Sequence, residues 1–218
     1  MKTYLILGYG IPKKIETNDN YHRYLGIVFN TIFAQLQVSQ DASTIIFCGG
    51  STDIYPPYKR NEALEIARLF MQFADRPICH GVTKKWKYLF EKKSLSTLEN
   101  LVYTKELLET KKIDFSHLTI FCEATRHKRV KRLVKKIFGK ANVTAIDFDL
   151  TENRYLDHES IEKREIASIK FDDAVLRDPH AMKEYRKAYQ QKFALLRSTG
   201  SEHLQESLRT WWKIETKK

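Results

Sequence analysis

Three apolar segments in this chain are each followed by small and polar residues, and this pattern predicts a binding site. The segments lie at 44–48, 88–91 and 118–122, and a helix-like pattern begins after each polar stretch. In open α/β sheets, ligands bind beyond the carboxyl ends of the strands, where helix N-termini also point. We therefore expect the three polar stretches to meet at one edge of a sheet and to bind a small molecule there.

Two residues in these stretches are candidates for acid–base chemistry. Glu62 lies in the first turn of a predicted helix, where the helix dipole favours a carboxylate. It would serve as a base, a hydrogen-bond acceptor or a metal ligand, or only as a structural residue. His127 follows the segment 118–122 and would suit a base or a hydrogen-bond donor, although a lone histidine is more often structural.

Other residues in the same stretches are candidates for ligand binding. Gly49 and Gly50 let the backbone turn sharply or approach a ligand closely, whereas Gly8 and Gly10 lack the third glycine of a dinucleotide-binding fingerprint. Arginine binds phosphate or carboxylate with two hydrogen bonds. Besides Gly49 and Gly50, the ligand-binding candidates are Ser51, Ser94, Thr97, Asn100, Thr125, Arg126 and Arg129.

Strand and helix signals alternate along the first part of the chain. The expected strands are at 3–7, 44–48, 88–91, 118–122 and 143–148. A second position for the third strand lies near Ile78. Apolar residues at helical spacing follow the strands, and Ser96 with Glu99 forms a predicted capping box at one helix start. We predict a three-layer, Rossmann-like α/β fold with a mostly parallel sheet of about five strands.

The pattern changes after Leu150. Regular strand signals end, charged residues become denser, and Pro179 precedes a long stretch of helical periodicity that includes Tyr185 and Tyr189. We therefore predict a Rossmann-like domain at 1–150 and a helical C-terminal extension at 151–218 that packs on it.

The composition favours a globular protein with anionic partners. Hydrophobic residues make up 42% of the chain, which is enough for a core and excludes an intrinsically disordered protein. No apolar run of about 18 residues could cross a membrane, and no secretion signal is evident, so we expect a cytoplasmic protein. The formal net charge of +11 favours anionic partners in general.

Together these segments resemble the YdcF/SanA/ElyC-like family of bacterial α/β proteins, long classed as a domain of unknown function. The matching residues are Gly49 and Gly50, Glu62 and Ala63, Ser94, Thr97, Glu99 and Asn100, and Thr125, His127 and Arg129. Arg23 resembles the family's arginine in the first helix. The family places an arginine three residues after its histidine, so Arg126 is an alternative to His127 for the histidine's place. The resemblance covers 3–149 and implies a Rossmann-like sheet with a polar site at its carboxyl rim.

These observations favour a protein that binds a small anionic ligand, of nucleotide type or otherwise phosphorylated. Such a protein could be a hydrolase or a group transferase, with Glu62 or His127 as acid or base and with Arg23 and Arg129 against negative charge. S-adenosylmethionine is another candidate, since Rossmann-like sheets accommodate nucleosides. The alternative is a nucleic-acid-binding accessory protein that uses the basic helix expected at 126–140. No metal site is predicted, because no compact cluster of Asp and His is present.

Overall fold

Five parallel strands form one sheet in the order β3-β2-β1-β4-β5. The computed structural model describes residues 1–148, 158–200, 203, 206–208 and 210–211. The strands are β1 (Lys2–Leu7), β2 (Ser43–Cys48), β3 (Trp86–Glu91), β4 (Leu118–Glu123) and β5 (Asn142–Ile146). All four pairings are parallel. The predicted Rossmann-like α/β class is therefore confirmed. The third strand ends at Glu91, as preferred from the sequence, and Ile78 lies instead in the short 3-10 helix η1 (Pro77–Cys79).

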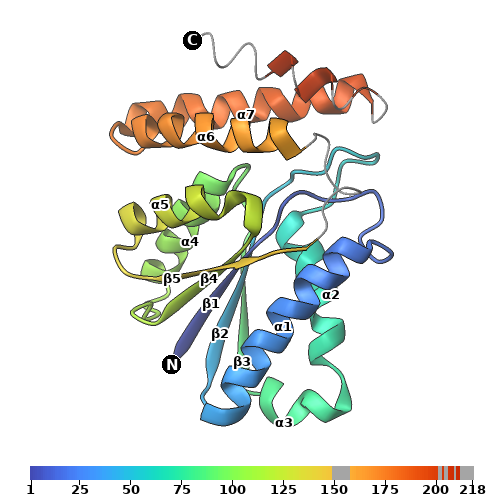
Figure 1. Cartoon of the computed structure of the whole chain (residues 1–218), viewed down its shortest axis with the longest axis vertical. Helices are drawn as coiled ribbons and strands as arrows, with labels where there is room; N and C mark the ends of the chain where they lie inside the picture. The colour runs from blue at the N-terminus through green and yellow to red at the C-terminus, as the bar shows by residue number, and fades with distance from the viewer. Residues whose placement is uncertain (149–157, 201–202, 204–205, 209, 212–218) are drawn as a thin grey trace.

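Helices cover both faces of the sheet (Figure 1). Alternate residues of β1 point to opposite faces, so that Tyr4 and Ile6 join one core and Leu5 and Leu7 join the other. The helices α1 (Asp19–Ser39), α2 (Glu62–Ala74) and α3 (His80–Thr83) contribute to the first core. The helices α4 (Thr97–Thr110) and α5 (His127–Ile137) contribute to the second. The result is the predicted three-layer arrangement.

The helix starts follow from local sequence. Asn18 caps α1 by accepting a hydrogen bond from the backbone N–H of Tyr21 at 2.9 Å. Ser96 caps α4 by accepting one from the N–H of Glu99 at 3.2 Å, and the Glu99 carboxylate accepts in return from the N–H of Leu95 at 2.6 Å. Side chains of this kind satisfy N–H groups that have no partner within the helix. The capping residue predicted for α4 is therefore confirmed, with the return bond made one residue earlier than in the usual capping box.

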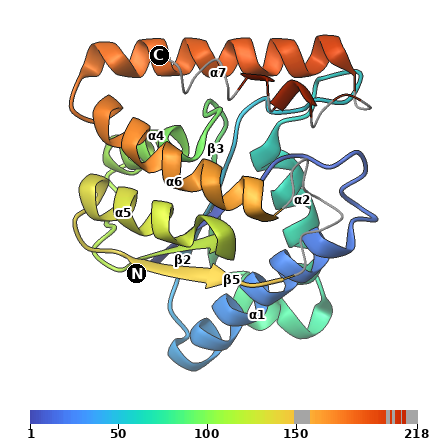
Figure 2. The same ribbon diagram turned by 45° about the horizontal axis from the view of Figure 1, so that its top comes forward.

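The C-terminal segment forms two helices that lie across the carboxyl ends of the strands (Figures 1 and 2). They are α6 (His158–Val175) and α7 (Pro179–Thr199), and we call them the cover helices. Arg186 of α7 pairs with Glu99 at 2.9 Å, and Arg197 donates to the carbonyls of Ser51 and Asp53 at 2.7 and 2.9 Å. These bonds attach α7 to the loops that follow β2 and β3. Of the predicted extension, residues 151–157, 201–202, 204–205, 209 and 212–218 lie outside the described ranges.

No helix within the described ranges is both long and apolar enough to cross a membrane. Of the two longest described helices, α7 carries charged residues along its length, whereas α1 carries Asp19 and Arg23 near its start and exposes polar residues farther along. The cover helices instead bury apolar side chains against the domain: Tyr185 and Tyr189 of α7 join the second core, and Trp211 packs edge-on against Tyr189 with ring centroids 5.5 Å apart. Burial of these large rings stabilises the cover helices on the domain.

Candidate functional site at the carboxyl rim

A cavity of about 150 Å³ lies between the carboxyl rim of the sheet and the cover helices. We call it the rim cavity. From β1 the sheet extends through β2 to β3 on one side, and through β4 to β5 on the other. The loops after β1 and β4 therefore diverge, which leaves the crevice where open α/β sheets bind ligands. Six predicted residues line the rim cavity: Glu62, Ser94, Thr97, Asn100, Arg126 and Arg129.

Glu62 is held rigidly at the base of the rim cavity. One carboxylate oxygen accepts from the N–H of Gly10 at 2.7 Å, and the other accepts from the hydroxyl of Thr52 at 2.9 Å. Gly8 and Gly49 pack directly against this side chain: a Cβ atom at Gly8 would overlap the carboxylate, and one at Gly49 would lie 2.7 Å from the Cβ of Glu62. Burial raises the pKa of Glu62 above its ordinary value. The glycines thus make room for a glutamate that favours its protonated form.

Two further glutamates each end a strand of the sheet and accept hydrogen bonds from the loop that follows. Glu91 ends β3 and accepts from the N–H of Lys93 at 2.6 Å, while Glu123 ends β4 and accepts from the N–H of Thr125 at 2.6 Å. In each case the carboxylate binds the backbone two residues on and turns the chain out of the sheet. Both side chains are buried, and burial raises the pKa of Glu91. These buried carboxylates therefore stabilise the loops at the carboxyl rim by accepting hydrogen bonds from their backbone.

Ser94 connects this layer to Asn100. The Ser94 hydroxyl lies 2.5 Å from a carboxylate oxygen of Glu91 and also contacts the side-chain amide of Asn100. A hydroxyl has one proton to donate, so the two contacts require either a proton on Glu91 or an amide nitrogen of Asn100 turned toward Ser94. The raised pKa of Glu91 agrees with the first arrangement. Ser94 is fully buried, and its structural effect is to orient Asn100 in the cavity wall.

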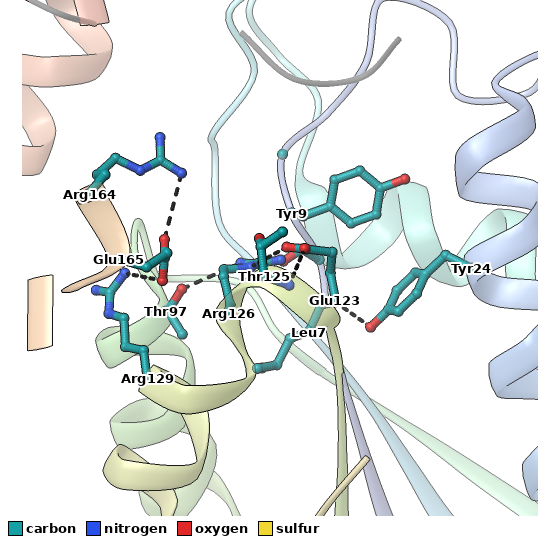
Figure 3. A network of polar contacts seen from close by, with 12 residues as sticks. Leu7, Tyr9, Tyr24, Thr97, Glu123, Thr125, Arg126, Arg129, Arg164 and Glu165 are labelled. Atoms are coloured by element: carbon teal, nitrogen blue, oxygen red, sulfur yellow. Dashed lines mark hydrogen bonds and ion pairs between the residues drawn. The ribbon is translucent and has the colours of Figure 1, made fainter. Parts of the chain in front are cut away.

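Arg126 connects the loop after β1 to the segment after β4 (Figure 3). It ends the short 3-10 helix η2 (Ala124–Arg126), which precedes α5. Its guanidinium donates to the carbonyl of Gly8 at 2.7 Å and to the hydroxyl of Thr97 at 3.4 Å, and it pairs with Glu123 at 3.3 Å. Arg126 thereby brings a permanent positive charge to the cavity wall.

Arg129 also lines the rim cavity, but a carboxylate of α6 engages it. Its guanidinium makes two hydrogen bonds to Asp172, at 2.6 and 3.1 Å, and lies 3.4 Å from Glu165. The sequence predicted Arg129 as a ligand-binding residue. In the structure it attaches α6 to α5.

The cover helices add two cations that the sequence did not predict. Arg164 of α6 and Lys192 of α7 line the rim cavity, and Arg164 lies 3.6 Å from Glu165. The Lys192 ammonium group lies 5.1 Å from the ring centroids of Tyr189 and Trp211. Burial, together with the neighbouring guanidinium groups, lowers the pKa of Lys192 to about 7. The only sequence signal was a lysine placed among aromatic residues at helical spacing.

Several predicted residues do not line the rim cavity. Arg23 is exposed on α1, and His127 begins α5 with its side chain partly exposed outside the cavity wall. The neighbouring Arg126 takes the place expected of His127, which agrees with the alternative that the motif spacing left open. Helix α5 begins only after the turn of η2, and this turn directs Arg126 inward.

The remaining predicted residues shape the rim loops. The N–H of Gly50 donates to the carbonyl of Ser94 at 2.7 Å, which joins the loops after β2 and β3. The carbonyl of Ser51 accepts from Arg197 of α7, and Thr125 binds Glu123 through its backbone. Gly49, described above, packs against Glu62. The loop formed by Gly8, Tyr9 and Gly10, which was not among the predicted site residues, lines the cavity directly.

The basic face of α5 is directed away from the rim cavity. Two of its cations, Arg132 and Lys136, pair with Asp173 of α6. Lys128, Lys131 and Lys135 are exposed. Within the described ranges, no three His, Cys, Asp or Glu side chains gather closely enough to hold a metal ion.

Comparison with known proteins gives no match: no family model, curated protein or solved structure matches this chain. The resemblance to the YdcF/SanA/ElyC-like family therefore stays an expectation based on motif spacing. The chemistry of the rim cavity itself is the basis for a functional proposal.

Proposed function

We propose that the rim cavity binds a small anionic ligand of nucleotide type, or another phosphorylated molecule with an apolar part. The observation that carries this proposal is the charge of the wall. Arg126, Arg129, Arg164 and Lys192 line the cavity, against the carboxylates Glu62 and Glu165. Since the pKa of Glu62 is raised by burial, positive charge is in excess among the groups that line the cavity, while Glu123 and Asp172, which pair with Arg126 and Arg129, lie outside this lining. Cations that line a partly enclosed cavity favour the binding of an anionic ligand.

The position of the phosphate follows from two features of the rim. Thr97 begins α4 and lines the cavity, and the start of a helix attracts anions through its backbone N–H groups and dipole. Arg126 lies beside it, with its guanidinium 3.4 Å from the Thr97 hydroxyl. We expect the phosphate to bind between these two residues and Arg164.

The apolar part of the ligand would lie against the cover helices. Ile161, Tyr189, Phe193, Leu196 and Leu208 line that side of the cavity. Aromatic and aliphatic side chains of this kind suit a nucleobase or another flat ring. A nucleoside phosphate has an anionic group for the cationic side of the cavity and a flat ring for the apolar side. It also matches the positive charge of the cavity better than S-adenosylmethionine, whose sulfonium carries a positive charge.

If the protein is a hydrolase or a group transferase, Glu62 is the acid–base residue that the geometry favours. It is buried in the cavity wall, its carboxylate is oriented by Gly10 and Thr52, and its pKa is raised by burial. A carboxyl group whose pKa is moved toward neutrality is suited to proton transfer. His127 is less suited, because it does not line the cavity.

A binding panel tests this proposal. Isothermal titration would compare nucleoside mono-, di- and triphosphates, sugar phosphates and S-adenosylmethionine. We expect a phosphorylated compound to bind, and Arg164→Gln to weaken that binding at least about tenfold, which corresponds to ~1.4 kcal/mol. Lys170→Gln is the matched control, because Lys170 is an exposed cation of the same helix. Failure of every phosphorylated compound to bind, or equal loss in both variants, would reject the proposal.

A further inference from the structure

Among the described residues that line the rim cavity, Lys192 alone carries a primary amine. The other cations of the wall are arginines, whose guanidinium groups stay charged at any physiological pH. Within the described part of the chain, the Lys192 side chain lies over the rings of Tyr189, Phe193 and Trp211 rather than against a carboxylate. Lys192 therefore differs in chemistry from every other cation of the site.

Burial and two neighbouring guanidinium groups favour the neutral form of Lys192. Arg164 and Arg129 belong to the same cavity wall, and their repulsion opposes the attraction of the ammonium group to the three aromatic rings within 5.5 Å. Burial and these guanidinium groups lower the pKa of Lys192 to about 7. A lysine that is desolvated and placed beside other cations is an activated nucleophile, because a large fraction of it is unprotonated at neutral pH.

We propose that Lys192 forms an imine with the carbonyl group of an anionic ligand, so that the rim cavity accepts a phosphorylated or carboxylated aldehyde or ketone. This inference rests on the proposed function, since the guanidinium groups would bind the anionic end of the same ligand. The neutral amine attacks the carbonyl carbon and forms a C–N bond. The carbonyl oxygen then leaves as water when the C=N bond forms, and no oxidant or reductant is needed.

The wall of the rim cavity suits this step in two respects. Glu165 lies between Arg129 and Arg164 (Figure 3), so a carboxylate that can accept a hydrogen bond from the attacking amine is present in the same wall. The rings of Tyr189 and Phe193, together with Ile161 and Leu196, cover the cavity from the side of α6 and α7. Exclusion of water by these side chains would slow hydrolysis of the imine.

Reductive trapping tests the inference on the full-length protein. The protein is incubated at pH 7 with glyceraldehyde 3-phosphate and sodium cyanoborohydride, and the modified lysine is found by peptide mass spectrometry. We expect Lys192 to be labelled at least about tenfold faster than Lys187, an exposed lysine of the same helix that does not line the cavity. Glycerol 3-phosphate, which binds as an anion but has no carbonyl, should slow the labelling of Lys192.

Lys192→Arg separates this inference from the proposed function. The variant has a permanent positive charge in place of an amine that is largely neutral at pH 7, so it should bind glycerol 3-phosphate at least as tightly as wild type and give no adduct in the cavity. Lys187→Arg should keep the Lys192 adduct. If wild type binds the phosphate but labels Lys192 no faster than surface lysines, the imine is excluded and anion binding stands. If wild type binds no phosphate and gives no adduct, both proposals fail.

Discussion

Arg129 and Asp172 form a buried ion pair with two hydrogen bonds, Nε to Oδ2 at 2.6 Å and Nη2 to Oδ1 at 3.1 Å. The side chains are 5% and 1% exposed, and the hydroxyl of Tyr185 adds a third bond to Asp172 at 3.2 Å. This pair joins α5 to α6 beside the rim cavity. The cover helices are therefore attached to the domain by charge as well as by apolar packing.

We predict that Asp172→Asn destabilises the protein strongly. Removal of one charge leaves the buried Arg129 guanidinium with the longer contact to Glu165, at 3.4 Å, in place of its two-hydrogen-bond counter-ion, and loss of one partner of a buried pair costs about 3–5 kcal/mol. The free energy of unfolding in urea measures this loss. The matched control is Asp173→Asn, one residue along the same helix. The partners of Asp173, Arg132 and Lys136, are 54% and 34% exposed, so we expect a loss of about 1 kcal/mol or less. Equal losses in the two variants would contradict the prediction.

We predict that Glu62→Gln changes how stability depends on pH. Burial raises the pKa of Glu62 in the folded protein above its unfolded value, so the folded state binds the proton more tightly. Glu62 therefore lowers stability progressively as pH rises from about 4.5 through the folded pKa. Glutamine can replace the bonds to Gly10 and Thr52 and does not titrate. The stability of Glu62→Gln relative to wild type should thus be greater at pH 8 than at pH 4, in urea unfolding at both values. A constant difference would show that the pKa of Glu62 is the same in the folded and unfolded states.

We predict that Gly8→Ala is destabilising because of Glu62. The added methyl group would overlap the Glu62 carboxylate, and overpacking of this kind costs about 1–3 kcal/mol. Gly81→Ala is the control: Gly81 lies in α3, its Cβ would meet open space, and alanine should stabilise that helix by about 0.5–1 kcal/mol. Thermal unfolding measures both. In a Glu62→Ala background the cost of Gly8→Ala should shrink, and an undiminished cost would mean that the overlap is not its cause.

We predict that Tyr24→Phe destabilises the junction of β1 and β4. The Tyr24 hydroxyl lies 2.8 Å from the carbonyl of Leu7 and 3.2 Å from that of Phe121, in the buried interior. The substitution removes the hydroxyl group, so these two buried carbonyl oxygens lose a hydrogen-bond donor, which costs about 1–2 kcal/mol. Tyr4→Phe is the comparison, because the Tyr4 hydroxyl binds the exposed side chain of Gln35. Chemical denaturation should show a smaller loss for Tyr4→Phe, and the reverse order would be evidence against this assignment.

The fold class and many of the residues at the carboxyl rim could be predicted from the amino-acid sequence alone. Strand and helix periods, the capping residues Asn18 and Ser96, and the polar residues after each strand are local signals, so they can be read without knowledge of distant contacts. Because parallel strands place their carboxyl ends at one edge, the same reading predicted that Glu62, Ser94 and Asn100 would lie near one another. The structure brings these residues to one cavity.

Which charged side chains line the cavity depends on tertiary packing and could not be predicted from local sequence. Arg126 and His127 are adjacent, and the turn of η2 before α5 directs the arginine inward and leaves the histidine outside the cavity wall. Arg164 and Lys192 reach the rim from helices far along the chain, and the partner of Arg129 lies 43 residues away. No local period encodes such contacts, because they depend on how α6 and α7 pack across the sheet. The electrostatics of the site were therefore set by packing between distant segments.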